Sequence, residues 1–449
     1  MSYQRNDNYA IIPDASGQRM LLLQEEVGWS LPRHAATLPD EINATMLASL
    51  GFTTFVLFCI YDRYQDGEYE EQHRVYVLDN LSPRVALPAN GRWIDQTELA
   101  SLSLAIQEHR AVLESWFTEG NDSQSVVLRP PWMRPGWFSG VEAWIDRQLA
   151  SQGEKRIAPI RQVAAQRWSS VLQIQSTAGV LYFKMPASIF EFEPALTQLL
   201  ARLVPDFVPR LLGVDLDRYW LLMRDEGPTL RTAWREPVHM EEAFRLYARM
   251  QIGLIPHVEE IEKTGSPDWR LPQMPHLYEN LLARTDLLLL DEPGGLTYAE
   301  YERLLALAPR LKEICTELAS YRVPETLQHN DLHSNNLTYN GERYTLIDLA
   351  ECILAHPFGS LFSSLRSARN RLGYDDQTIE RLRMVYLSEW LAYEPIERLE
   401  RAFALAQCLG ALYRALLWQM VQAEIAPEER RMNYADMLPS YLRDFLEMA

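Results

Sequence analysis

The first 118 residues alternate between hydrophobic patterns that are typical of strands and patterns that are typical of helices. Thr53–Tyr61 is a run of β-branched and aromatic residues that predicts a central strand, and His73–Leu78 predicts its partner. Asp40–Leu50 has helical spacing after an aspartate that predicts an N-terminal cap, and Thr97–Trp116 predicts a longer helix. These elements predict a small α+β domain over residues 1–118.

The composition changes between Gly120 and Gly136, where the sequence reads GNDSQSVVLRPPWMRPG. The prolines of this segment have no backbone N–H and a fixed φ, so they exclude a regular helix. Val141–Ser151 then returns to helical spacing. We therefore expect a linker and a helix over residues 119–154.

The rest of the chain changes from strand patterns to helix patterns near residue 228. Short β-like runs occupy residues 155–228, at Ile157–Val163, Ser170–Gln175, Val180–Lys184 and Tyr219–Met223. Helical spacing prevails over residues 229–449, for example at Met240–Ile252, Leu277–Leu290 and Tyr298–Tyr321. A strand-rich part followed by a helical part predicts two lobes with a cleft between them.

Polar residues suited to catalysis gather in the segment His329–Leu349, which reads HNDLHSNNLTYNGERYTLIDL. Its Asn340-Gly341 pair lies between apolar alternations, which is a strong hairpin signal, so the chain should fold back on itself. This hairpin would return Asp348 to the neighbourhood of Asp331 and Asn336. Two carboxylates and an amide oxygen make a site suited to Mg²⁺, as phosphoryl transfer requires. The structural alternative is a hairpin that is merely capped by polar turns.

The same segment resembles a known catalytic loop. His329–Asn336, followed by Ile347-Asp348, is similar to the catalytic loop and metal-binding aspartate of the aminoglycoside phosphotransferase family, which shares its fold with protein kinases. The resemblance covers roughly residues 155–430 and implies a bilobal domain, with a strand-rich N-lobe (155–228) and a helical C-lobe (229–449). It also implies that Asp331 is the catalytic base and that Asn336 and Asp348 bind magnesium.

The chain departs from the family pattern at three positions. Asn330 stands where the family usually has glycine, which could alter the backbone of the loop. His356 and Ser360 stand in place of two acids in the segment that follows the metal-binding aspartate. These replacements put in question a contact that anchors a helix, but not the chemistry.

The resemblance also predicts where ATP binds. Lys184 ends the strand Val180–Lys184 and is expected to pair with phosphate oxygens. Glu193, at the start of the next predicted helix, is expected to position this lysine, although Glu191 could take that role. The preceding loop contains no glycine, so Ser169 and Ser170 are expected to contact the phosphates.

Charge and composition limit the partners of the chain. Lys and Arg number 43 against 61 Asp and Glu, which gives a net charge of −18. Such a surface repels nucleic acid and anionic membranes, and accepts a neutral or cationic small molecule more easily. The cysteines form no CxxC pair and the N-terminus has no signal peptide, which favours the reducing cytoplasm. The longest apolar stretch, Ala402–Val421, is interrupted by Gln407 and Arg414 and predicts a buried helix.

The N-terminal domain carries a second resemblance. Gly28–Pro32 (GWSLP) before a helix is similar to the entry of the Nudix hydrolase fold. The Nudix helix needs a cluster of acids to hold metal, and Ile42–Gly51 (INATMLASLG) supplies none. The resemblance therefore implies a degenerate Nudix-like domain that does not hydrolyse diphosphates and serves in recognition, regulation or dimerisation.

The leading hypothesis is an ATP- and Mg²⁺-dependent phosphotransferase that acts on the hydroxyl group of a small molecule. Aminoglycosides, amino alcohols such as choline, sugars and nucleosides remain open as acceptors. One alternative is a nucleotide-binding pseudokinase or scaffold, favoured by the glycine-free loop and Asn330, although a scaffold has no need for Asp331. Another is an atypical protein kinase, but Pro357 follows Asp348 too closely for a peptide-docking activation segment. Nothing in the sequence indicates an oligomeric state.

Overall fold

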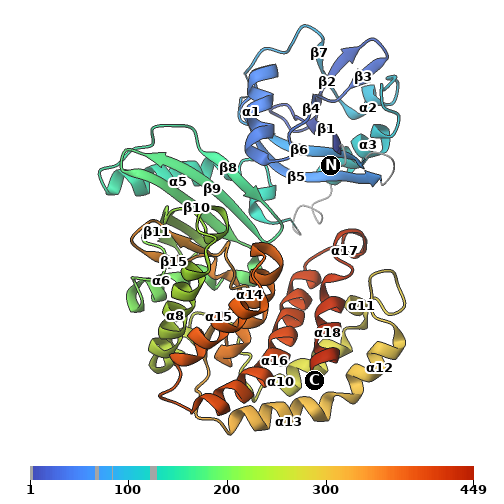
Figure 1. The fold of residues 1–449 in the computed structure, drawn as a ribbon. Helices are drawn as coiled ribbons and strands as arrows, with labels where there is room; N and C mark the ends of the chain where they lie inside the picture. The colour runs from blue at the N-terminus through green and yellow to red at the C-terminus, as the bar shows by residue number, and fades with distance from the viewer. Residues whose placement is uncertain (1–3, 66–69, 83, 122–128) are drawn as a thin grey trace. The chain divides into compact units, whose positions relative to one another are not determined.

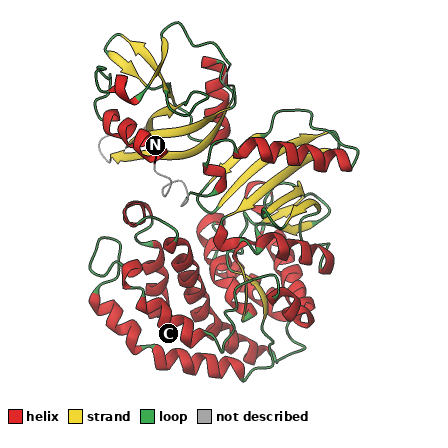
Figure 2. Cartoon of the chain, turned by 180° about the vertical axis from the view of Figure 1, so that it is seen from behind, coloured by secondary structure: helices red, strands yellow, loops and turns green. Residues whose placement is uncertain are grey.

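The chain divides into two compact units, Met1–Ser188 and Ile189–Ala449, in a computed structural model that describes residues 4–65, 70–82, 84–121 and 129–449 (Figure 1). Both units combine strands and helices, which confirms the predicted α+β class (Figure 2). Part of the predicted linker, 122–128, lies outside the described residues. The domain boundaries predicted at residues 118, 154 and 228 stay predictions. Among the described residues, no helix is both long and apolar enough to cross a membrane.

Two sheets form the N-terminal part of the first unit. One has the strand order β4-β1-β6-β5 and contains β1 (Gln4–Ile11), β4 (Arg33–His34), β5 (Thr54–Gln65) and β6 (Glu70–Asn80). The other has the order β3-β2-β7 and contains β2 (Met20–Glu25), β3 (Gly28–Ser30) and β7 (Gly91–Ile94). Because β5 and β6 are antiparallel neighbours, the predicted pairing of Thr53–Tyr61 with His73–Leu78 is confirmed.

Helix α1 (Pro39–Leu50) covers one face of the four-stranded sheet, where Ile42 and Met46 are fully buried in a cluster with residues of β1, β5 and β6. The prediction of an aspartate cap is wrong. The residue before the helix is Leu38, which offers no side-chain hydrogen bond, and Asp40 lies inside the first turn. A negative charge there still favours the helix by facing the positive end of its dipole.

The single helix predicted over Thr97–Trp116 is also wrong, because the structure has two helices, α2 (Gln96–Leu99) and α3 (His109–Asn121). The residues between them pair with the backbone of Trp29, whose N–H donates to Ser103 and whose carbonyl accepts from Ala105, both at 2.9 Å. These tertiary hydrogen bonds hold the segment extended and override its local helical spacing.

The first unit ends in a helix and three antiparallel strands. They follow the short η1 (Pro131–Met133) and are α5 (Trp137–Ser151), β8 (Arg161–Ala165), β9 (Ser169–Ser176) and β10 (Gly179–Pro186). Trp137 and Trp144 of α5 each contact the ring of Phe183 in β10, with centroids 6.0 Å apart. This packing fixes the helix on the strands that were predicted to bind ATP.

The second unit starts with a helix and a hairpin and continues mostly as helices. Its first elements are η2 (which spans the unit boundary at Ser188–Phe190), α6 (Glu193–Leu203), β11 (Leu211–Asp215) and β12 (Trp220–Arg224). The helices before the predicted catalytic segment are α7 (Leu230–Ala233), α8 (Pro237–Leu254), η3 (Ile255–His257), α9 (Val258–Glu262), α10 (Met274–Ala283), α11 (Thr285–Leu288), α12 (Tyr298–Ala306) and α13 (Ala308–Ala319). Those after it are α14 (Leu361–Ser367), η6 (Ala368–Leu372), α15 (Asp376–Ser388), α16 (Ile396–Ala423), α17 (Pro427–Asn433) and α18 (Met437–Met448).

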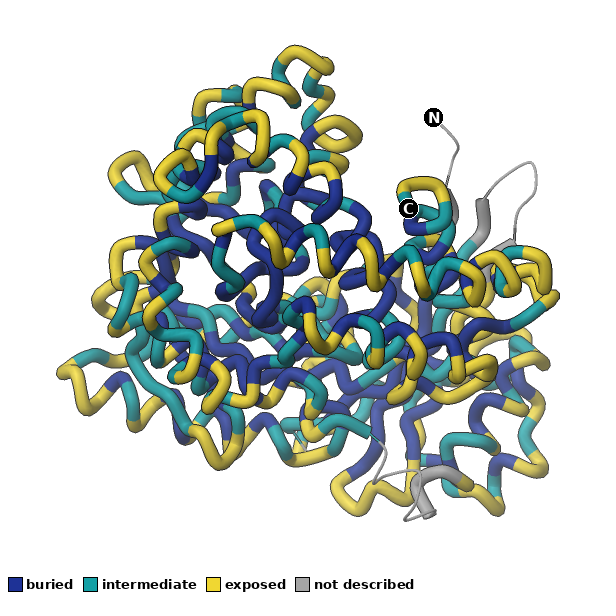
Figure 3. The backbone as a smooth tube through the Cα atoms, turned by 90° about the horizontal axis from the view of Figure 1, so that it is seen from below, coloured by how far each residue is buried: buried dark blue, intermediate teal, exposed yellow. Residues whose placement is uncertain are grey.

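Helix α16 forms the core of the second unit and confirms the buried helix predicted over Ala402–Val421. Its backbone comes close to η5 (Pro357–Ser360) and α14 at Gly410, where a Cβ would lie 2.5 Å from Phe362 Cβ and 2.8 Å from the carbonyl of Gly359. Many of the other helices alternate between buried and exposed residues along their length, as expected for amphipathic packing (Figure 3).

Candidate active site

The predicted catalytic segment lies between two short strands in the second unit. Strand β13 (Thr326–His329) pairs with β16 (Cys352–Ala355) in antiparallel register, with His329 opposite Cys352. Strands β14 (Leu337–Tyr339) and β15 (Tyr344–Leu346) form the predicted hairpin between them. The hairpin therefore returns the chain to its starting point, as the Asn-Gly signal predicted.

Asn336 lies directly beside Asp331. Its Nδ2 donates to the carbonyl of Asp331 at 3.0 Å and lies 3.5 Å from Asp331 Oδ2. The backbone N–H of Ile347 donates to the carbonyl of Asn336 at 2.9 Å, so the residue before Asp348 is tied to Asn336. The structure thus brings the three predicted residues of the segment to one place.

Asp348 has a strained backbone. Its φ of 60° and ψ of 66° place a non-glycine residue in the left-handed region, and η4 (Leu349–Glu351) begins directly after it. Its side chain is exposed. Strain of this kind is retained where the surrounding structure enforces it and is frequent at functional sites.

Arg414 and Glu351 also belong to the site, although their sequence positions did not predict it. Arg414 of α16 is buried, and its Nη1 lies 3.5 Å from Asp331 Oδ1 and in short contact with Glu351 Oε2. The signal for Arg414 was its place as the one charged residue of the stretch Ala402–Val421. No comparable signal identified Glu351.

Charges around Asp331 keep it ionised. Burial alone would raise the pKa of Asp331, but the Arg414 guanidinium and a contact with His333, at 3.2 Å from Oδ2, lower that pKa below its ordinary value. Burial also raises the pKa of Glu351. The negative charges of Glu351 and Asp331 raise the pKa of Arg414, although burial alone would lower it. Because the two side chains are in direct contact, we assign Glu351 as the ionised partner of Arg414.

A comparison with protein families agrees with this geometry. Residues 159–396, more than half of the 449, match the family described as "Phosphotransferase enzyme family". The chain belongs to this family. It is accordingly a phosphotransferase with an alcohol group as the acceptor and a protein-kinase-like fold, which confirms these predictions. A comparison with curated proteins found no match.

Solved structures with a similar fold include two that are related only distantly in sequence. A choline/ethanolamine kinase family protein from Mesorhizobium loti is 16% identical, with 68% of this chain and 95% of that chain covered and a TM-score of 0.46. A choline kinase from Cryptosporidium parvum is 10% identical, with 69% and 95% covered and a TM-score of 0.49.

The structure explains why this phosphotransferase tolerates Asn330. Among the described residues, positive φ at a non-glycine position occurs only at Tyr219, Leu289, Asp291 and Asp348, so position 330 does not need a glycine backbone. The Asn330 side chain instead donates to the carbonyl of Tyr413 in α16 at 3.2 Å. The replacement therefore ties the loop to the helix that carries Arg414.

Ser360 keeps an anchoring contact without the two acids, whereas the His356 side chain only accepts the N–H of Phe358, at 3.4 Å. Ser360 Oγ bonds to Tyr247 Oη at 2.7 Å and to Gln328 Oε1 at 3.2 Å, and Tyr247 Oη also accepts the N–H of His329 at 2.8 Å. Burial lowers the pKa of His356 to about 3, so this residue is neutral. A neutral network thus holds the start of the catalytic loop.

The predicted nucleotide-binding residues of the first unit lie on neighbouring strands. Lys184 of β10 is opposite Val171 of β9, and Pro186 is opposite Ser169. Because side chains alternate along a strand, Ser169 faces the same side of the sheet as Lys184, whereas Ser170 faces the other. The hydroxyl of Ser170 is buried and has no hydrogen-bond partner in the described part of the chain. This geometry favours Ser169 over Ser170 as a side-chain contact.

The turn between β8 and β9, which contains no glycine, is tight. The N–H of Gln166 donates to the carbonyl of Ser169 at 2.9 Å, and the indole of Trp132 donates to the carbonyl of Gln166 at 3.0 Å.

In the second unit, Glu193 begins α6 and is buried. The rival candidate Glu191 is hydrogen-bonded to the hydroxyl of Tyr219, which raises the pKa of that tyrosine. Glu193 therefore remains the stronger candidate.

Proposed function

We propose that this phosphotransferase moves the terminal phosphoryl group of ATP to a hydroxyl group of a neutral or cationic small molecule, with Asp331 as the catalytic carboxylate. The observation that carries the proposal is the ionised Asp331 held beside Asn336 by Arg414 and His333. A carboxylate in this position can accept a hydrogen bond from the acceptor hydroxyl and aim its oxygen at the phosphorus.

The lowered pKa of Asp331 indicates how it would act. A carboxylate whose pKa is below the ordinary value is a weak base, so it gains little by removing the proton early. In a loose phosphoryl-transfer transition state the hydroxyl keeps its proton until late, and orientation contributes more than basicity. We therefore assign Asp331 mainly to orientation of the hydroxyl, with the proton passing to it as the new bond forms.

Asn336 and Asp348 would hold Mg²⁺. Asn336 uses its Nδ2 on Asp331, whereas its Oδ1 accepts no hydrogen bond from any described residue and would be available as a ligand. Within the described residues, no group of three or more His, Cys, Asp or Glu side chains is arranged for a metal ion, and Mg²⁺ typically needs only one or two carboxylates beside phosphate oxygens and water. When bound, the ion neutralises charge on the phosphates.

Lys184 and Ser169 would contact the phosphates of ATP, and Glu193 would position Lys184. Ser170 would contribute through its backbone, because its hydroxyl faces away from the side of Lys184. The net charge of −18 favours acceptors that are neutral or positively charged.

The test is a transfer assay with Mg²⁺ and ATP against aminoglycosides, amino alcohols, sugars and nucleosides. ADP release is followed together with the mass of each acceptor, and at least one acceptor is expected to gain a phosphoryl group. Anionic acceptors with the same hydroxyl serve as controls for the charge argument. ATP binding without transfer to any acceptor would instead support the pseudokinase or scaffold, and transfer to peptide hydroxyls would support the protein kinase.

A further inference from the structure

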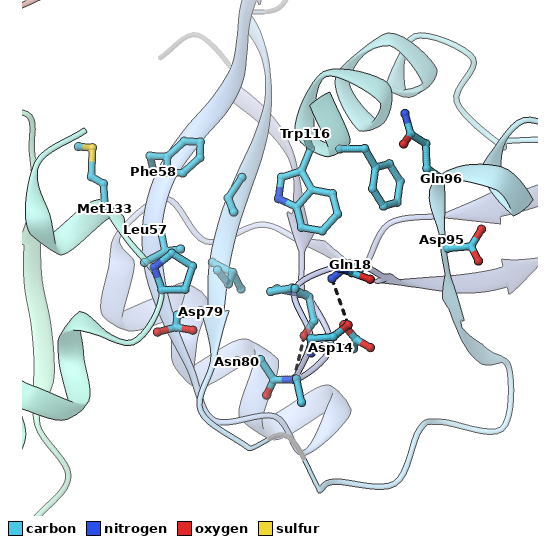
Figure 4. Close-up of a pocket in the computed structure, with 18 of the residues that line it drawn as sticks. Asp14, Gln18, Leu57, Phe58, Asp79, Asn80, Asp95, Gln96, Trp116 and Met133 are labelled. Atoms are coloured by element: carbon cyan, nitrogen blue, oxygen red, sulfur yellow. Dashed lines mark hydrogen bonds between the residues drawn. The ribbon is translucent and has the colours of Figure 1, made fainter. Parts of the chain in front are cut away.

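A cavity of about 820 Å³ lies in the N-terminal part of the first unit, far along the chain from the catalytic segment. Its volume falls in the range of about 300–1,000 Å³ that is usual for small-molecule sites. Figure 4 shows Leu57, Phe58 and Asp79 on one wall, with Trp116 and Gln18 across from them. None of these residues has a part in the proposed phosphoryl transfer.

The lining combines aromatic rings with an excess of negative charge. Trp116 is half-buried, and its ring contacts that of Phe117 with centroids 4.8 Å apart, so part of the indole remains available to a ligand. Asp14, Asp79 and Asp95 line the cavity, and Arg129 is the cation among the lining residues. The Arg129 guanidinium lies 4.0 Å over the Phe58 ring.

The carboxylates differ in how their charge is balanced. Asp14 pairs with Arg19 at 2.7 Å, and Asp95 caps α2 by accepting the N–H of Glu98 at 2.8 Å. Asp79 is 8% exposed and accepts the N–H of Gly136 at 2.7 Å, but no Lys, Arg or His of the described chain forms an ion pair with it. Burial raises the pKa of Asp79 accordingly. A buried carboxylate without a counter-charge is costly, and a cation in the cavity would supply that charge.

We propose that this cavity binds a small organic cation with a flat ring, which stacks on Trp116 and pairs its charged nitrogen with Asp79. Aromatic faces and a desolvated carboxylate are the two groups that recognise such a cation most strongly. An anion would meet three carboxylates, and a neutral ring would leave Asp79 without a counter-charge.

The walls of this cavity are connected to the strands predicted to bind ATP. Gly136, the partner of Asp79, directly precedes α5, and Phe138 of that helix stacks on Phe55 of β5 with centroids 4.8 Å apart. Trp137 of the same helix packs on Phe183, the neighbour of Lys184. A ligand that changes the contact between Asp79 and Gly136 would therefore act on β10, a consequence that rests on the proposed function.

Calorimetric titration of the full chain without nucleotide tests the site independently of catalysis. Three probes share an indole ring and differ in charge: tryptamine is a cation, tryptophol is neutral and indole-3-acetate is an anion. Tryptamine is expected to bind saturably, tryptophol more weakly and indole-3-acetate not detectably. Equal binding of all three, or no saturable binding of tryptamine, overturns the proposal.

Variants locate the binding. Asp79→Asn should weaken tryptamine at least tenfold, and it keeps an oxygen that accepts the N–H of Gly136, so the fold is preserved. Trp116→Leu should weaken the binding of both tryptamine and tryptophol. Glu26→Gln, which removes an exposed charge outside the cavity, should leave both affinities unchanged. Unchanged affinity in Asp79→Asn overturns the site even if Trp116→Leu fails to fold.

Transfer activity with and without tryptamine tests the connection. A change in rate that disappears in Asp79→Asn supports it. Binding of tryptamine without any change in rate overturns the connection and leaves the cation site standing. If the wild type shows no transfer activity with any acceptor, the proposed function is contradicted. The calorimetric test of the cation site remains valid in that case.

Discussion

Asp331 keeps its charge because Arg414 and His333 lie beside it. The sequence alone could predict that Asp331, Asn336 and Asp348 lie together, since they stand before and after one hairpin. It could not predict the partner of Arg414, because that contact joins α16 to a loop far earlier in the chain. A lone charge in an apolar stretch such as Ala402–Val421 shows that a partner must exist, but not which residue it is.

Arg414→Met should move the acid limb of the activity profile to higher pH. Arg414 lowers the pKa of Asp331, so its removal raises that pKa. Asp331 then becomes protonated, and activity is lost, at a higher pH than in the wild type. The dependence of kcat/KM on pH measures this shift. Arg401→Met, at an exposed position of the same helix, is the control and should leave the profile unchanged.

Stability gives a second view of the same pair. Removing Arg414 leaves Glu351 without its partner, which should lower the free energy of unfolding by about 3–5 kcal/mol. Adding Glu351→Gln should recover part of this loss without recovering activity. A double variant no more stable than the single one would show that Glu351 is not the ionised partner.

Elements were predicted best where the hydrophobic pattern is long or bounded by a strong turn. The hairpin around Asn340-Gly341 and the buried helix around Ala402–Val421 are confirmed for that reason. The pattern over Tyr298–Tyr321 is real, but the chain forms α12 and α13, with Pro309 in the first turn of the second helix. The helical spacing of apolar residues continues across the break between α12 and α13, because each of the two helices buries an apolar face. The spacing alone therefore does not reveal where one helix ends and the next begins.

Gly227→Ala tests the close approach between the backbone at Gly227 and the hairpin that follows the catalytic loop. Gly227 has φ +90°, and a Cβ there would lie 3.0 Å from the Cα of Asn340. Alanine is strained at this φ, so the variant should lose at least about 1 kcal/mol of unfolding free energy. Gly253→Ala, an exposed helical position with open space around it, should be neutral or gain up to about 1 kcal/mol. Chemical denaturation compares the two, and equal stabilities would contradict the close approach.

At the scale of the whole molecule, the side chain of Gln162 is one of the contacts that join the N-terminal sheets of the first unit to the strands β8–β10. Gln162 of β8 accepts the N–H of Val56 at 2.9 Å and donates to its carbonyl at 2.7 Å, at the edge strand β5. Asn43 of α1 donates to the same side chain at 3.1 Å. The sequence could not indicate this junction, because a glutamine in a strand carries no sign of its partner.

Gln162→Leu should loosen this junction. It leaves the N–H and carbonyl of Val56 buried without partners, which should lower the free energy of unfolding by about 1–3 kcal/mol. Gln175→Leu, at an exposed position of β9, is the matched control. Hydrogen exchange at the N–H of Val56 should accelerate in Gln162→Leu only. Unchanged exchange there would mean that the Gln162 side chain does not protect this N–H at the edge of the sheet.

The account rests on Asp331 as the catalytic carboxylate, and one measurement tests it most directly. Acceptor-dependent ADP release is compared between the wild type and Asp331→Asn, with ATP binding measured in both. We predict equal ATP binding and a rate that falls by about 10²–10⁴-fold in the variant, because an amide cannot take up the proton of the hydroxyl as the new bond forms. A variant that transfers phosphate at the wild-type rate would contradict the account.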